Sequence, residues 1–243
     1  MKKVIIIILL FSIFLIGCNT ISADTIISTT AETTIITETT INHSNNTINY
    51  DYDNLKAEYD ILAEDKQKLE DENKAYDYLI RNLNNLLRNV YYGEATNDVG
   101  GTGNFTGFTI YYKNKYYILT AGHCVENENG KFSNFKFKAN FSNEWIYPKL
   151  LAYKYNRTGL DYAIFIEDKI NNGFVTFNNN SDGKKYILGS IHNNLNVFKE
   201  FDANAIQGES GSPIINIKQE LIGICTSKGS FTGINVVLTT IDK

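Results

Sequence analysis

The spacing of apolar residues changes repeatedly along this 243-residue chain, and each change predicts a different kind of segment. Residues 1–17 start with two lysines and continue as a nearly unbroken apolar run from Val4 to Ile16. This run is shorter than the ~20 residues that span a bilayer, and with its charged start it is typical of a secretory signal peptide. Residues 18–50 are rich in Thr, Ile, Asn and Ser without a helical period, which predicts a disordered tether.

Residues 51–90 carry a heptad pattern and a higher density of charge, which predicts a coiled-coil-like helix about 60 Å long. Acidic e and g positions would repel each other in a parallel dimer, so the pattern predicts a helix more firmly than an oligomer. Two interpretations stay open: a weak homo-oligomer through residues 51–90, or a single amphipathic helix whose last turns pack on the domain that follows. The apolar positions of this heptad seam are Tyr52, Leu55, Tyr59, Leu62, Leu69, Tyr76, Ile80, Leu83, Leu87 and Val90, and Leu79 and Leu86 widen its end.

From residue 91 onward, short runs of β-branched and aromatic residues alternate with polar turns. Such a pattern predicts many short strands and a mainly β domain over residues 91–243, either a sandwich or a barrel. The predicted strands are Phe105–Tyr112, Lys115–Thr120, Lys136–Phe141, Trp145–Tyr153, Tyr162–Glu167, Phe174–Phe177, Lys185–Ile191, Val197–Phe201, Pro213–Ile217, Leu221–Thr226 and Gly233–Thr240.

Charge and cysteine content exclude several functions. The formal net charge is −4 and no basic stripe is visible, so nucleic acid is not an expected partner. The three cysteines, Cys18, Cys124 and Cys225, lack the paired spacing of a metal site, and we expect neither metal nor cofactor. For Cys124 and Cys225 two buried thiols are favoured over a disulfide bridge.

Three short motifs carry the candidate chemistry. His123 ends a predicted strand in LTAGHC (119–124), Asp161 opens one in GLDYAIFI (159–166), and Ser210 lies in GESGSP (208–213). A serine hydroxyl becomes a nucleophile when a base takes its proton, and a buried carboxylate orients that base. The motifs predict a Ser210–His123–Asp161 triad, since Glu167 and Asp168 follow the strand at its far end. The N–H groups of Gly208 and Ser210 would form an oxyanion hole.

The order His, Asp, Ser with these motifs resembles the chymotrypsin-like serine protease superfamily. The segments DANAIQGESGSP (202–213) and LIGICT (221–226) are similar to HtrA-type proteases. For the domain that follows the long N-terminal helix, the resemblance implies a two-barrel fold and a serine endopeptidase that cleaves proteins or peptides through an acyl-enzyme. Glu209 stands where HtrA-type enzymes have Asn and where trypsins have an Asp that pairs with a newly cut N-terminus. The resemblance therefore does not imply this activation step for the present chain.

The resemblance also places a substrate pocket. Relative to the nucleophile, its lining would include Asn204, Gln207, Thr226 and Lys228. None of these is acidic, so a preference for Lys or Arg at the cleavage site is not expected. Two preferences at the cleavage site stay open: a small or medium apolar residue, or an acidic residue attracted by Lys228.

The end of the apolar run, LIGC (15–18), resembles the lipobox of bacterial lipoproteins. This implies a lipid on Cys18 and stable attachment to the extracytoplasmic side of a bacterial membrane, in the cell envelope. The alternative is an ordinary signal peptide with a chance cysteine. Two other functions also stay open. The chain could be a catalytically silent protease fold that serves as a binding or adhesion module, or a surface lipoprotein whose coiled coil is the working part.

Overall fold

The computed structural model describes residues 38–128, 130–156, 159–180, 182–191, 195–202, 208–227 and 230–243. By its internal contacts the chain divides into residues 1–63 and residues 64–243, and the second unit contains every strand. The predicted signal peptide, Cys18 and much of the predicted tether lie outside the described residues. Among the described helices, none has the length and apolar character that a membrane span requires.

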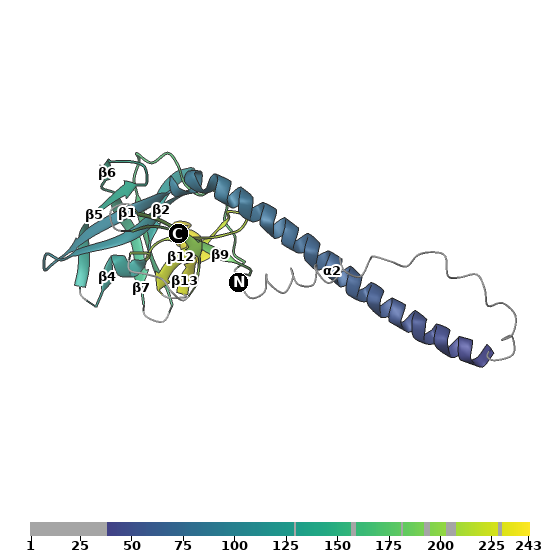
Figure 1. Ribbon diagram of the computed structural model, residues 1–243. Coiled ribbons are helices and arrows are strands. Elements are labelled where there is room, and N and C mark those ends of the chain that lie inside the picture. The colour runs from purple at the N-terminus through teal and green to yellow at the C-terminus, as the bar shows by residue number, and fades with distance from the viewer. Residues whose placement is uncertain are drawn as a thin grey trace. The chain divides into compact units, whose positions relative to one another are not determined.

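The first sheet has the strand order β4-β5-β1-β2-β3-β8-β7, with β6 paired to β5. Strands β1, β2, β4, β5, β6 and β7 are labelled in Figure 1. Strands β2 and β3 form the predicted hairpin, and its turn residues Lys113 and Asn114 both have positive φ, as a two-residue type I′ turn requires. The strands of the first sheet are β1 Val90–Asn97, β2 Thr102–Tyr112, β3 Lys115–Thr120, β4 Glu126–Asn127, β5 Gly130–Ala139, β6 Trp145–Ile146, β7 Lys149–Tyr155 and β8 Asp161–Ile166.

The second sheet has the order β10-β9-β11-β12-β13, and all its pairings are antiparallel. Its apolar side chains join those of the first sheet in one core cluster that includes Phe108, Ile164, Leu188 and Leu221. The mainly β fold predicted from sequence is therefore confirmed. The strands are β9 Lys185–Ile191, β10 Leu195–Glu200, β11 Pro213–Asn216, β12 Leu221–Ser227 and β13 Ser230–Gly233.

Three strand predictions need correction. The segment Phe174–Phe177 is not a strand, because it makes only isolated bridges, from Phe174 to Ile110 and from Phe177 to Leu221. The prediction of a strand over Gly233–Thr240 is wrong, because this segment forms helix α3, Ile234–Ile241. Its buried residues Ile234 and Val237 are spaced as on one face of a helix, and this tertiary packing outweighs the strand preference of β-branched residues. The predicted strand Trp145–Tyr153 is split into β6 and β7, since Pro148 lacks the N–H that a continuous strand would donate.

The long helix predicted before the β domain is present as α2, Glu38–Leu87, and its bounds differ from the prediction. It includes residues 38–50, which the sequence pattern assigned to the tether. Extending an existing helix is far less costly than starting a new one, which accounts for the longer element. The helix ends before residue 90 because Val90 begins β1 and pairs with Phe108 of β2.

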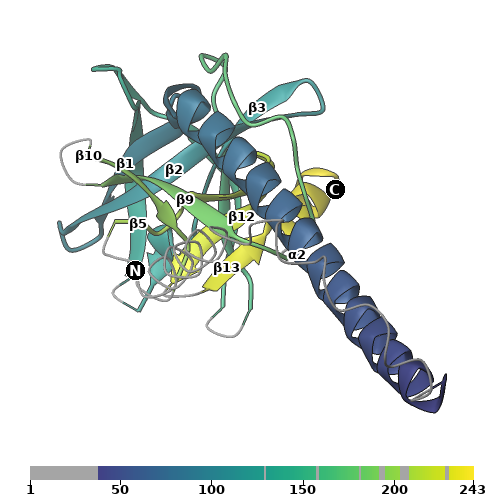
Figure 2. The ribbon, with the colours of Figure 1, turned by 45° about the vertical axis from the view of Figure 1, so that its right-hand side comes forward.

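The end of α2 packs on the β domain, as Figure 2 shows beside β2 and β9. Leu79, Leu86 and Leu87 are buried in the same core cluster as Phe108 and Leu188. Tyr76 also contacts the ring of Tyr186, with 6.0 Å between ring centroids. These contacts support the interpretation of an amphipathic helix whose last turns pack on the domain that follows. The earlier seam residues Tyr52, Leu55, Tyr59, Leu62 and Leu69 have exposed side chains.

Candidate active site

His123 lies in a single 3-10 turn, Gly122–Cys124, that follows β3. The turn brings the backbone of Gly122 against β7, where an added Cβ would lie 2.0 Å from the carbonyl oxygen of Lys154. Only glycine fits this close approach. The hydrophobic strand therefore stops abruptly and presents the imidazole at its end.

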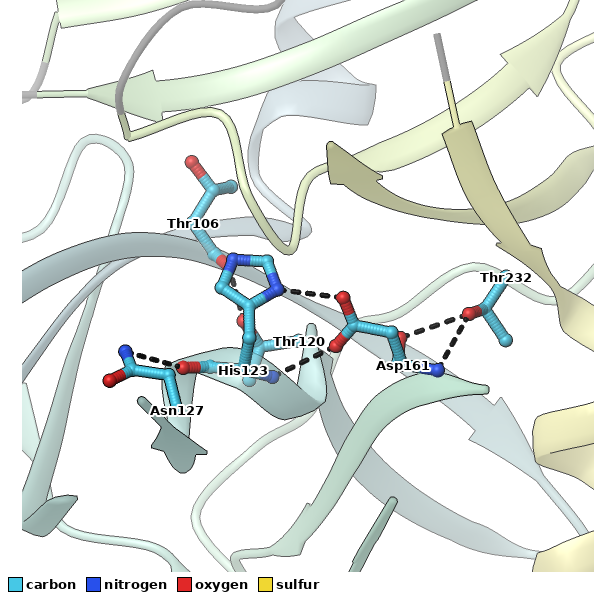
Figure 3. Close-up of polar contacts among 6 residues, drawn as sticks. All are labelled: Thr106, Thr120, His123, Asn127, Asp161 and Thr232. Atoms are coloured by element: carbon cyan, nitrogen blue, oxygen red, sulfur yellow. Dashed lines mark hydrogen bonds and ion pairs between the residues drawn. The ribbon is translucent and has the colours of Figure 1, made fainter. Parts of the chain in front are cut away.

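Asp161 is the first residue of β8 and lies beside this turn (Figure 3). Its Oδ2 is 2.7 Å from His123 Nδ1, and its Oδ1 accepts the backbone N–H of His123 at 2.8 Å. The backbone of Asp161 is itself held by β13, because its N–H donates to Thr232 Oγ1 and its carbonyl accepts the Thr232 hydroxyl. Asp161 as a whole residue is 8% exposed, whereas Glu167 is half-buried and Asp168 is exposed beyond the far end of β8.

These contacts determine the protonation of the ring. An ionised carboxylate only accepts hydrogen bonds, so the facing Nδ1 carries the proton and Nε2 is left to accept one. Burial is the largest single influence on the imidazole and lowers its pKa, but the hydrogen bonds and charges of Asp161 and Cys124 together outweigh it. The net pKa of His123 lies above the ordinary value of 6.5.

Ser210 lies in a turn between Gly208 and Gly211, both of which have positive φ. An added Cβ at Gly211 would lie 2.0 Å from the Thr106 carbonyl oxygen, so this turn packs directly on β2. The carbonyl of Gly208 accepts the Thr106 hydroxyl at 2.8 Å, and the carbonyl of Ser210 accepts the Thr106 N–H at 2.9 Å. Within the described residues, the N–H groups of Gly208 and Ser210 donate no hydrogen bond, which leaves two donors in the turn of Ser210.

Thr106 connects the turn of Ser210 to the strand that precedes His123. The Thr120 hydroxyl donates to the Thr106 carbonyl at 2.7 Å, and Thr120 ends β3 just before the His123 turn (Figure 3). In the described part of the chain, no hydrogen bond links the Ser210 hydroxyl to the His123 ring. Such bonds are often long in ligand-free enzymes and tighten when substrate binds.

Glu209, the residue before the serine, is fully buried and forms an ion pair with Lys199 of β10, with 2.9 Å between Nζ and Oε1. Sequence reasoning singled out Glu209 but missed Lys199. A signal was present, because side chains two apart in a strand share a face. In the predicted strand Val197–Phe201, Lys199 would share a face with Phe201, which packs in the core of the second sheet.

Neither remaining cysteine is placed as a nucleophile. Cys124 and Cys225 are buried free thiols. Burial, with the charge of Glu209 as the next contribution, raises the pKa of Cys225 to about 12, so its thiol stays protonated at neutral pH. Among the described residues, no group of three His, Cys, Asp or Glu side chains is arranged to hold a metal ion.

Of the four residues predicted to line the substrate pocket, one lies within the described residues. Thr226 lies near the end of β12 and is buried. Asn204, Gln207 and Lys228 lie outside the described residues, and so the substrate preference stays a prediction.

Comparison with known structures identifies the fold. The Rv3671c protease of M. tuberculosis, in its active form, has a TM-score of 0.54 and 14% identity, over 66% of this chain and 82% of that one. A serine endoprotease of Yersinia pestis has a TM-score of 0.52 and 19% identity, over 69% of this chain and 65% of that one. The chain therefore has the fold of chymotrypsin-like serine proteases. It matches no model of a protein family and no curated protein.

Proposed function

We propose that the protein is a serine endopeptidase that uses Ser210, His123 and Asp161. The observation that carries the proposal is the 2.7 Å contact between Asp161 and His123 Nδ1, on the fold of serine proteases. It leaves Nε2 as the acceptor that the proposal needs for the proton of the Ser210 hydroxyl. Protein or peptide substrates are the class that this fold suggests.

In the proposed reaction the Ser210 oxygen attacks the scissile carbonyl carbon while His123 Nε2 takes the hydroxyl proton. The carbonyl π electrons move to oxygen, and the resulting oxyanion is bound by the N–H groups of Gly208 and Ser210. The imidazolium, stabilised by Asp161, returns the proton to the leaving amine as the peptide C–N bond breaks. Water then attacks the acyl-enzyme by the same proton transfers and releases Ser210.

Most of the expected rate effect comes from the N–H groups of Gly208 and Ser210 and from the buried carboxylate of Asp161. Loss of one oxyanion-hole donor typically costs about 3 kcal/mol in the transition state. Asp161 acts by holding one tautomer and by stabilising the imidazolium.

The direct test is labelling by a fluorophosphonate, which reacts only with an activated serine. We expect the native chain to be labelled and Ser210→Ala to lose both labelling and peptide hydrolysis while it keeps its fold. Ser133→Ala, in an exposed position on β5, is the matched control and should be labelled like the native chain. Equal labelling of Ser210→Ala and the native chain would move the nucleophile elsewhere.

The same experiment separates the second candidate function, a silent protease fold that binds a partner. A folded native chain that reacts with no fluorophosphonate would favour that function. The pair His123–Asp161 favours the enzyme, because a binding module does not need a carboxylate aimed at an imidazole nitrogen.

For location we propose a lipid on Cys18 and attachment at the outer side of a bacterial membrane. The support is the LIGC sequence after a short apolar run. The native protein should partition into a detergent phase, and Cys18→Ser should release it or stop its processing. Native protein with an unmodified N-terminus in the soluble fraction would contradict the anchor. A protease attached in this way would meet surface proteins at high local concentration.

A further inference from the structure

A chain of buried hydrogen bonds connects the end of α2 to the turn that carries Ser210. The Asn140 side-chain amide donates to the carbonyl of Leu87 at 3.2 Å, and its oxygen accepts the Ser190 hydroxyl at 2.8 Å. The Ser190 N–H donates to Thr106 Oγ1 at 3.1 Å, and the Thr106 hydroxyl donates to the carbonyl of Gly208 at 2.8 Å. The chain thus links the helix, both sheets and the nucleophile turn.

The side chains in this chain are all buried, and Thr106 and Ser190 are fully so. A buried polar group without a partner is costly, and here each member supplies the partner of the next. The arrangement is therefore satisfied only when the helix end, Asn140, Ser190 and Thr106 are all in place. This series of hydrogen bonds can therefore couple the helix end to the turn of Ser210, since disturbing one member leaves another unpaired.

Thr106 fixes the carbonyls on both sides of the Glu209–Ser210 peptide, through its hydroxyl to Gly208 and its N–H to Ser210. The Glu209 carbonyl, in turn, accepts the N–H of Ser212 at 3.0 Å. In a trans peptide the C=O and N–H point in opposite directions, so the Ser210 N–H is turned away from that bond. With its neighbours fixed, this N–H keeps one direction.

We infer that Thr106 is a positioning residue for the oxyanion donors, and that Asn140 and Ser190 couple it to the packing of α2. This inference rests on the proposed protease function. Thr106 touches no reacting atom, and its role is to hold the turn in which the Ser210 N–H points into the site. The helix would then support catalysis as well as stability.

The test compares three variants of the full chain. Thr106→Val keeps the shape but lacks the hydroxyl, Thr106→Ser keeps the hydroxyl, and Thr109→Val is the matched control. Thr109 is a buried threonine on the same strand whose hydroxyl contacts the Asn89 carbonyl at 3.3 Å, outside the chain of bonds. We expect Thr106→Val to lower kcat about tenfold to a hundredfold with little change in KM, by analogy with loss of an oxyanion donor.

The controls separate positioning from general damage. Thr106→Ser should keep most of kcat, Thr109→Val should keep kcat despite lost stability, and the pH midpoint of Thr106→Val should equal that of the native chain. A native kcat in folded Thr106→Val overturns the positioning role. If Thr106→Val does not fold, Ser190→Ala applies, since it keeps the backbone N–H and should lower kcat by a smaller factor.

The coupling to α2 has its own test, with Leu79→Ala to loosen the helix. We expect Leu79→Ala to lower kcat in the native chain and to lower it less in a Ser190→Ala background, because coupled sites are not additive. Equal factors in both backgrounds overturn the coupling. Amide exchange of residues 208–212 provides a readout that does not need turnover. It should quicken in Thr106→Val and not in Thr109→Val, even if the native chain proved inactive and the proposed function failed.

Discussion

The two halves of the site are held in different ways. His123 and Asp161 are fixed first by two direct hydrogen bonds to each other, and the backbone of Asp161 is also held by Thr232 of β13. On the second sheet, the turn of Ser210 is fixed by Thr106 of β2 and by Lys199 of β10, neither of which lies in its motif. His123 and its carboxylate are thus joined by direct contacts, whereas the turn of Ser210 is held by residues that lie outside its motif.

The largest expected effects come from the base side. His123→Ala should be about as damaging as Ser210→Ala, because members of such a triad act as a unit. Asp161→Asn should keep the fold but lower kcat about 10⁴-fold, since the amide would favour the wrong tautomer. Steady-state hydrolysis of a peptide ester measures both. An Asp161→Asn variant with near-native turnover would assign the role to another carboxylate.

The pH dependence sharpens the same comparison. The base works unprotonated, so kcat/KM should rise with pH through a midpoint above 6.5, where the pKa of His123 lies. Asp161→Asn should move that midpoint down, because burial, which lowers the pKa, is then less opposed. The free energy of unfolding depends on pH in the opposite direction. The raised pKa means that the pair stabilises the fold fully below the unfolded pKa, and this contribution is lost as pH rises through the folded pKa.

On the nucleophile side the expected damage is to stability first. Lys199→Met leaves the fully buried carboxylate of Glu209 without its cation, which should cost about 3–5 kcal/mol in the free energy of unfolding. Adding Glu209→Gln to this variant should restore much of the loss, since the buried charge is removed. Urea unfolding measures each change. If Lys199→Met proved as stable as the native chain, the ion pair would not be what holds this turn.

The comparison also explains what the sequence could predict. The strand-ending motif of His123 and the apolar strand after Asp161 are local patterns, and the structure brings these two residues together. The mainly β fold and the long helix were predicted as well. Thr106, Thr232 and Lys199 were not, because their roles depend on contacts between segments far apart in the chain. Helix α3 was missed because packing, rather than local preference, determined it.

Helix α2 offers a second comparison within one element. Leu79, which widens the end of the heptad seam, is fully buried in the core, whereas Leu62 on the seam is 66% exposed. Leu79→Ala should therefore cost about 2–5 kcal/mol in the free energy of unfolding, and Leu62→Ala close to nothing. Thermal and urea unfolding of the two variants test this directly. Equal losses would mean that the helix is stabilised along its whole length, and would contradict packing at its end alone.

The smallest expected effect concerns the exposed part of that seam. Apolar side chains at Leu55, Leu62 and Leu69 favour a second copy of the helix, while the acidic e and g positions oppose it by tenths of a kcal/mol per pair. We therefore predict weak self-association, with a dissociation constant of about micromolar or above. Sedimentation equilibrium of residues 51–243 measures it, with Leu62→Lys as the disruptive variant. Ile61→Lys is the matched control, because Ile61 is equally exposed but lies off the seam. A strictly monomeric native chain at high concentration would leave this part of α2 as a spacer, and equal weakening by both variants would mean that the seam does not direct the association.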